Sequence, residues 1–191
     1  MHVRFSTCKG TAVVEEGTEE GIGILSGILI HPDKATIEGF FVQPLGIGLG
    51  KEPFLLSSDI IHWGVSIRVR DRAVLGDIAD IVRLQDILQQ RRPILGQRIR
   101  TEAGRMVGWC RDIQFNTERF MLEWLFPKKW FWWGVALPAS DIFEVKEEAI
   151  IVRDSVAAVP EEKRKRVSTV VEKIEEIVEA GVAEPTTFHG E

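Results

Sequence analysis

Histidine and cysteine, the side chains most often used for catalysis and metal binding near neutral pH, are few and scattered in this sequence. His31 falls in a predicted turn and His62 near a predicted pair of strands. Cys8 and Cys110 show neither the spacing of a metal site nor that of a disulfide framework. Because acid–base work and metal binding need several such groups to converge, we expect no enzyme, no cofactor, no metal and two plain thiols.

Two glycine-rich stretches invite comparison with phosphate-binding loops. GIGILSG (residues 21–27) lacks the third glycine of the dinucleotide-binding pattern, because position 26 is serine. GIGLGKE (residues 46–52) lacks the first glycine of the P-loop, and its lysine is followed by glutamate where Ser or Thr is required. We therefore expect the first stretch to form a turn and bend in a sheet, and the second a hairpin loop.

The segment FPKKWFWWG (residues 126–134) carries the densest group of aromatic side chains. If residues 127–129 form the loop of a hairpin, strand alternation predicts that Trp124, Trp130 and Trp132 face the core with Leu122. The opposite face then carries a second apolar set, flanked by the two loop lysines. The candidate interaction surface on this hairpin consists of Leu125, Lys128, Lys129, Phe131 and Trp133.

A sheet that is half exposed to water normally alternates apolar and polar residues, so a hairpin that is apolar on both faces needs a cover. Three covers are consistent with the sequence: the chain's own C-terminal segment, a partner protein or second copy of the chain, and a membrane interface. Base stacking is the least favoured, because the formal net charge is −5.

The C-terminal segment PEEKRKRVSTVVEKIEEIVEAG is predicted to be an amphipathic helix that ends near Gly181. The basic run KRKR within it is interpreted as a solvated face. The same segment has an apolar stripe at helical spacing, which completes the candidate interaction surface. The stripe consists of Val167, Val170, Val171, Ile174, Ile177 and Val178.

The chain contains an internal repeat, which predicts its architecture. Residues 10–72 and 96–154 share a glycine–turn–glycine opening, a Ser-Asp-Ile step at positions 58–60 and 140–142, and a final Val-Arg-Asp. Each copy has short β-branched and aromatic runs separated by polar turns, which is typical of a small antiparallel barrel. Between the copies, Asp77 is placed to cap a short helix that Pro93 stops.

These motifs together resemble the PRC-barrel family, named for the cytoplasmic barrel of the photosynthetic reaction-centre H subunit and also found as the C-terminal domain of a ribosome maturation factor. The second copy resembles it more closely, since Gly27 replaces the acid found at Asp112. The resemblance implies a small β-barrel used as an adaptor or docking module, with no catalytic residues to carry over. It implies neither photosynthesis nor ribosome binding.

The sequence therefore predicts a mainly β protein with two tandem small antiparallel PRC-like β-barrels, residues 1–72 and 96–154. A connector with a short helix, residues 73–95, joins them, and a C-terminal amphipathic α-helix and tail follow over residues 155–191. We expect a non-enzymatic protein–protein adaptor; the alternatives are a ribosome-assembly or RNA-processing factor acting through protein contacts, and a small-ligand binder between the barrels. The longest apolar run, residues 22–30, is too short to span a bilayer. We expect a cytoplasmic protein with an unidentified protein partner, a homodimer left open, no direct nucleic-acid binding and at most peripheral membrane attachment.

Overall fold

The computed structural model describes residues 1–45 and 52–155, all within one compact unit, and these residues are mainly β, as predicted. The elements of the first half are β1 (His2–Arg4), α1 (Phe5–Cys8), β2 (Ala12–Glu15), β3 (Gly21–Ile30), β4 (Ile37–Pro44), β5 (Phe54–Leu56), η1 (Ser57–Asp59), β6 (Ile60–Trp63) and β7 (Ile67–Val69). The connector contains η2 (Arg72–Val74), β8 (Leu75–Gly76), η3 (Ile78–Asp80) and α2 (Val82–Gln90). The second half contains β9 (Arg98–Thr101), β10 (Met106–Asn116), β11 (Met121–Lys129), β12 (Trp132–Trp133), β13 (Leu137–Pro138), η4 (Ala139–Asp141), β14 (Ile142–Val145) and β15 (Ala149–Val152).

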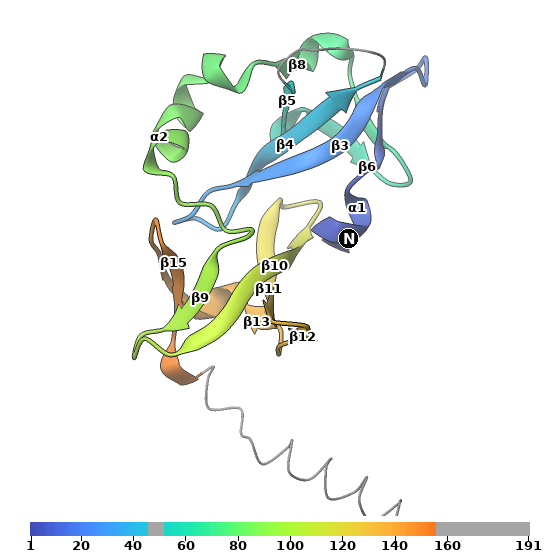
Figure 1. Ribbon diagram of the computed structural model, residues 1–191. Helices are drawn as coiled ribbons and strands as arrows, with labels where there is room; N and C mark the ends of the chain where they lie inside the picture. Colours follow the sequence, from blue (N-terminus) through green and yellow to red (C-terminus); the bar gives the residue numbers. More distant parts are fainter. Residues whose placement is uncertain (46–51, 156–191) are drawn as a thin grey trace, which may run out of the picture. The chain divides into compact units, whose positions relative to one another are not determined.

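Each half forms one curled sheet, and the strands of the two sheets follow equivalent orders (Figure 1). The first sheet runs β6-β7-β2-β3-β4-β5-β8, and the second runs β12-β11-β10-β9-β15-β14 with β13 on β11. In both sheets the first strand of the repeat pairs in parallel with the last, β2 with β7 and β9 with β15. The internal repeat seen in the sequence is therefore a repeat of strand order as well.

The two sheets also share their bulges. In the first sheet the register between β3 and β4 shifts at Ser26 and at Glu38. In the second, the register between β10 and β11 shifts at the equivalent positions, Arg111 and Glu123. An extra residue on one strand bends it and increases its twist, so these paired bulges account for the matching curl of the sheets.

The predicted faces of the aromatic hairpin were wrong, because β11 contains a bulge at Glu123. Because it inserts one residue, Leu122 and Leu125 are both buried, at 4% and 0% exposed, although an even alternation would place them on opposite faces. Leu125 therefore lies in the core and not on the outer face. Trp124, predicted to be in the core, is 39% exposed instead.

The position of the turn in this hairpin was also predicted wrongly. Lys128 pairs with Trp133 and Lys129 with Trp132, so Trp130 and Phe131 form a two-residue turn and Pro127 lies within β11. The predicted loop at residues 127–129 would have placed Trp130 and Trp132 in the core. Instead, Trp130 is 84% exposed in the turn, and Trp132 is 74% exposed in β12, where it pairs with Lys129.

The turn of the β3–β4 hairpin contacts the turn of the equivalent β10–β11 hairpin. The two turns are related by an approximate internal two-fold axis. Thr36 bridges Met121, the Ile37 amide donates to the Phe120 carbonyl, and the Leu122 amide donates to the Ala35 carbonyl. Phe40 and Trp63 of the first half pack against Phe115 and Phe120 of the second, with ring centroids 5.6–6.2 Å apart. One hydrophobic core therefore runs through both sheets.

The N-terminal segment crosses to the second sheet before the chain enters the first. β1 pairs antiparallel with β10. The buried Asp112 carboxylate then accepts hydrogen bonds from the Ser6 amide (3.0 Å), the Ser6 hydroxyl (2.6 Å) and the Ile113 amide (2.9 Å). A buried carboxylate with three donors is well compensated for its loss of water, so Asp112 anchors α1 to the second sheet.

The connector contains the short helix expected between the repeats. The Ala79 amide donates to Asp77 Oδ1 (2.9 Å), which caps η3, and α2 follows. Arg91 ends α2 in a left-handed conformation, two residues before Pro93. The predicted C-terminal helix, with its stripe from Val167 to Val178, lies outside the described residues.

Candidate interaction surface

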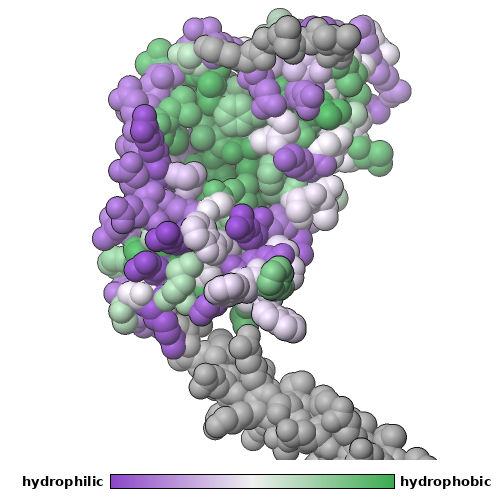
Figure 2. All heavy atoms as spheres, viewed as in Figure 1, coloured by the Kyte–Doolittle hydropathy of each residue, from purple (hydrophilic) through white to green (hydrophobic). Residues whose placement is uncertain are grey.

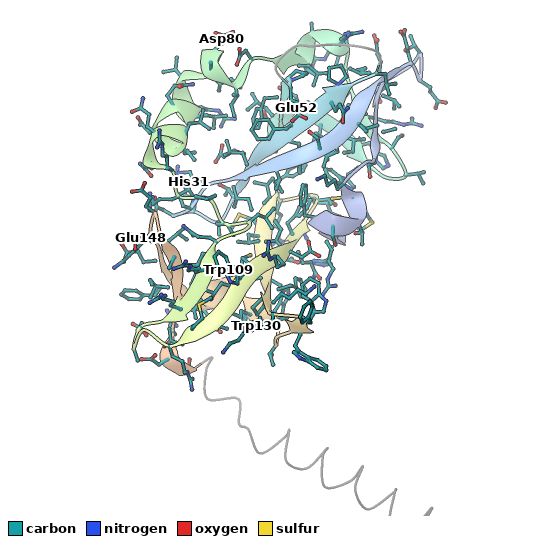
Figure 3. All side chains as sticks on the ribbon, viewed as in Figure 1. His31, Glu52, Asp80, Trp109, Trp130 and Glu148 are labelled. Carbon is teal, nitrogen blue, oxygen red and sulfur yellow. The ribbon has the colours of Figure 1, made fainter. Side chains whose placement is uncertain are left out.

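Four consecutive aromatic residues protrude at the end of the β11–β12 hairpin, and we call Trp130–Trp133 the aromatic tip. Their exposed fractions are 84% for Trp130, 87% for Phe131, 74% for Trp132 and 55% for Trp133. Trp130 has φ = +56°, a left-handed conformation that is unfavourable for a bulky side chain. Figure 3 labels Trp130 at this end of the second sheet. The tip thus combines exposed apolar area with local backbone strain.

Beside the tip, aromatic and cationic side chains alternate across four strands. Strand register places Trp133 next to Lys128, Lys128 next to Trp109, and Trp109 next to Arg98. Lys128 Nζ lies 5.3 Å from the centre of the Trp133 ring, and Arg98 Cζ lies 5.1 Å from that of Trp109. Both distances are within cation–π range. We call Arg98, Trp109, Lys128 and Trp133 the aromatic–cation row; Trp109 is labelled in Figure 3.

The row borders a hollow of about 300 Å³ that is lined by cations and aromatic or apolar side chains, without a carboxylate. Its lining residues are Met106, Trp109, Arg111, Lys128, Lys129 and Trp130. Arg111 is the extra residue of a bulge, and its Cζ lies 5.9 Å from the Trp109 ring centre. The adjoining hollow is lined by one acid, the exposed Glu148, together with Arg98 and Trp109. This part of the surface is therefore locally positive although the chain is acidic.

The structure brings some of the predicted surface residues together and separates others. Lys128, Lys129, Phe131 and Trp133 lie together in β11, the turn and β12, whereas Leu125 is buried below them. Sequence reasoning missed Arg98, Trp109 and Arg111. The alternation of Arg98 and Arg100 with Ile99 and Thr101 is a signal that Arg98 faces outward, but its proximity to Trp109 depends on strand register.

A second apolar surface lies in the first half, beside α2, and we call it the α2 groove. It is a cavity of about 440 Å³ lined by residues 28–30 of β3, Ile87 and Leu88 of α2, and residues 91–95. Figure 2 shows apolar side chains gathered over β3, β4 and α2 on this face. At the groove, Arg92 pairs with Asp33 (2.6 Å) and donates to the Val145 carbonyl (3.0 Å).

The remaining candidate residues have structural roles. GIGILSG lies within β3, and a Cβ on Gly23 would come within 2.6 Å of the Gln43 carbonyl oxygen, so this glycine serves strand packing. His31 Nδ1 accepts from the Asp33 amide (3.2 Å), as Asn116 Oδ1 accepts from the Glu118 amide (2.9 Å) at the equivalent turn. Asp59 and Asp141 end equivalent 3-10 turns.

The two cysteines are free and buried. Burial raises the pKa of both thiols to about 12, so each is protonated near neutral pH and is a poor nucleophile. Within residues 1–45 and 52–155, no group of three or more His, Cys, Asp or Glu side chains is placed to hold a metal ion.

No helix in the described part of the chain is long and apolar enough to cross a membrane. No protein-family model and no curated protein sequence matches the chain.

Proposed function

We propose that the protein is a non-enzymatic adaptor built on two tandem PRC-like β-barrels. The motif resemblance supports this proposal, as do the equivalent strand order and shared bulges of the two curled sheets. Adaptors act by presenting surfaces, and catalytic groups need not converge in them. The C-terminal amphipathic helix remains part of the proposal from its sequence pattern.

The observation that carries the proposal is the presence of two apolar surfaces of different chemistry. The α2 groove is a concave, aliphatic cavity in the first half. The aromatic tip is an exposed turn of the second half, bordered by lysines. Two unlike surfaces on one chain allow two unlike partners to be held together, which is what an adaptor requires.

The α2 groove fits an apolar segment of a partner protein with a carboxylate beside it. Its walls carry Ile28, Leu29, Ile87 and Leu88, which are half-buried. Arg91, at the end of α2, is exposed at the rim. Interfaces combine an apolar centre with a polar rim, so the aliphatic walls would bury apolar side chains and Arg91 would receive the acid.

Affinity purification with matched α2 variants tests this use of the groove. Ile87→Asp places a charge among the aliphatic walls and should remove the groove's protein partners. Val82→Asp lies on the same helix outside the groove, where the side chain is already 85% exposed, and should leave those partners in place. The adaptor proposal fails if both variants capture the same proteins as the unmodified chain.

The size of the groove also favours a second candidate, a small apolar ligand, because cavities of about 300–1,000 Å³ hold such molecules. Native mass spectrometry of the purified chain distinguishes the two, since a retained ligand adds a defined mass that Ile87→Asp should remove.

The affinity purification described above also tests the ribosome-assembly alternative, because ribosomal proteins would then dominate the captured set. A chain ending at Asp154 tests whether the C-terminal segment contributes to either outcome.

A further inference from the structure

The aromatic tip is energetically unfavourable in water, and the fold itself does not explain why it is present. Trp130 and Phe131 are more than four-fifths exposed, so packing within the described structure contributes little to offset their contact with water. Trp130 also occupies the left-handed region, where glycine or asparagine is preferred in turns. Exposed, strained and apolar residues of this kind are characteristic of functional surfaces.

The repeat supplies an internal control for the neighbouring row. In the first sheet, the same register joins Ala12, Ile24 and Gln43. In the second sheet, the equivalent residues are Arg98, Trp109 and Lys128. Because the first sheet forms the same pairings without a cation or an aromatic ring in this row, the row of the second sheet is not needed to form the sheet.

The chemistry of the tip and its border fits a lipid surface. Tryptophan favours the headgroup region of a bilayer, where its ring is apolar and its N–H remains hydrated. Lys128, Lys129 and Arg111 border the tip, and the hollow that they line holds no carboxylate. Basic side chains next to inserted apolar ones bind anionic headgroups.

We propose that the aromatic tip inserts into the headgroup region of a membrane rich in anionic lipid, with Lys128, Lys129 and Arg111 contacting lipid phosphates. The hairpin is suited to this because its two-residue turn places Trp130 and Phe131 beyond the last pair of the sheet, Lys129 with Trp132. The contact is peripheral and reversible. It supplies the second partner of the proposed adaptor but does not depend on what the α2 groove binds.

Vesicle flotation of the full chain tests this proposal. Vesicles of phosphatidylcholine alone are compared with vesicles that contain about one third phosphatidylglycerol, at low salt and at about 0.15 M salt. We expect binding to the anionic vesicles, weakened by salt, with a blue shift of tryptophan fluorescence. The double variant Phe131→Ser/Trp132→Ser should abolish flotation, while Phe143→Ser, an aromatic residue 62% exposed in β14, should not.

Charge variants separate the electrostatic contribution from the apolar one. Lys128→Gln/Lys129→Gln should reduce partition onto anionic vesicles by about thirtyfold, since each basic residue near such a surface contributes about fivefold. Arg119→Gln, exposed at the opposite end of β10 and β11, should have little effect. All these positions are at least partly exposed, so the variants should fold, which circular dichroism checks.

The proposal is overturned by no flotation with anionic vesicles, by equal flotation with neutral ones, or by unchanged flotation of the tip variant. Binding of the tip to an RNA oligonucleotide or a protein in place of vesicles would also overturn it. Ile87→Asp should float like the unmodified chain. A negative flotation result therefore does not contradict the adaptor proposal. A negative result for protein partners at the α2 groove does not contradict the membrane proposal.

Discussion

The two sheets of this protein share strand order, register and bulges, yet their outer faces differ in chemistry. At equivalent positions the first sheet has Ala12 and Gln43 where the second has Arg98 and Lys128. All of the tryptophans that are exposed lie in the second half. Because one architecture accommodates both faces, the architecture sets the strand positions and leaves the outer side chains free to acquire a function.

The inner faces of the sheets, by contrast, are built alike. Phe40 and Leu125 occupy equivalent positions, and each is 0% exposed. Their strands also share the bulge at Glu38 and Glu123. Both sheets therefore contribute to one core, and apart from the buried Asp112, which replaces Gly27, the chemical difference described above concerns their outer faces.

The largest effect is expected from breaking the shared core. Phe40→Ala removes a ring that contacts Trp63, Phe115 and Phe120, and it should lower the free energy of unfolding by about 3–5 kcal/mol. Urea unfolding measures this loss. Phe131→Ala, at the exposed tip, should change it by less than about 0.5 kcal/mol. Equal losses for the two variants would contradict the division between a common core and a functional surface.

The next largest effect concerns Asp112, whose equivalent in the first sheet is Gly27. Asp112→Ala leaves the amides of Ser6 and Ile113 without their acceptor. It should lower the free energy of unfolding by about 2–3 kcal/mol, because hydrogen bonds to a charged group are worth about 1.5–3 kcal/mol each and lost ones are only partly replaced by water.

Ser6→Ala is the matched control for Asp112→Ala. It removes the hydroxyl but keeps the amide donor, and should cost about 1 kcal/mol. Hydrogen exchange should show the amides of α1 and β1 losing protection in Asp112→Ala, while the amides of β3 keep theirs. Uniform loss of protection over both sheets would show that Asp112 does not specifically anchor the N-terminal segment.

The repeat, most of the strands and the connector helix could be predicted from the sequence, because their signals are local. Alternating apolar residues and polar turns mark strands such as β9 and β10. Asp77 marks the start of the helical part of the connector, where it caps η3, and Pro93 lies just after the end of α2. These features depend on residues near one another in the chain, so one sequence suffices to find them.

The faces of the hairpin could not be predicted, because a bulge belongs to a pair of strands. Glutamate is not a residue type that marks a bulge, as glycine would be, and the extra residue Glu123 reverses the faces of Trp124 and Leu125 relative to Leu122. The turn at Trp130 and Phe131 was hidden for a related reason. Bulky aromatic residues are poor turn formers, so the neighbouring Pro-Lys-Lys was the more favourable choice on propensity.

Only some residues of the candidate site could be predicted from the sequence, because the others join it through the pairing of strands. Lys128, Lys129, Phe131 and Trp133 are close in sequence and were found together. Arg98 and Trp109 join them through two further strand registers. Register is set by side-chain packing across the whole sheet, so the aromatic–cation row emerges only from the three-dimensional arrangement.

A smaller effect, of opposite sign, is expected at the turn of the aromatic tip. Trp130→Gly removes a side chain from a left-handed position and should raise the free energy of unfolding by about 0.5–1 kcal/mol. The same variant should weaken flotation with anionic vesicles, because one ring of the tip is lost. Gly10, in the first half, already has φ = +89°, so Gly10→Trp should destabilise instead. A Trp130→Gly chain that is less stable would show that the ring packs on the fold.

The smallest effect is expected at Asp33, which pairs with Arg92; its equivalent in the second half, Glu118, pairs with the N-terminal ammonium group. The hydrogen bond from Arg92 lowers the pKa of Asp33, and the N-terminal ammonium group lowers that of Glu118. A carboxylate whose pKa is lower in the folded state stabilises the fold above its unfolded pKa, about 3.9 for Asp, and this contribution is lost as the pH falls through the folded value.

Asp33→Asn should therefore lower the free energy of unfolding at pH 7 and leave it unchanged at about pH 2.5, where both forms are neutral at this position. The loss at pH 7 should be a few tenths of a kcal/mol, because the Asp33 side chain is 54% exposed and water screens the pair. Urea unfolding at the two pH values measures it. Arg92 also donates to the Val145 carbonyl of β14, so Arg92→Gln should cost more than Asp33→Asn at pH 7. If the two variants cost the same, the contact with the second sheet adds nothing, and Arg92 acts only within the first half.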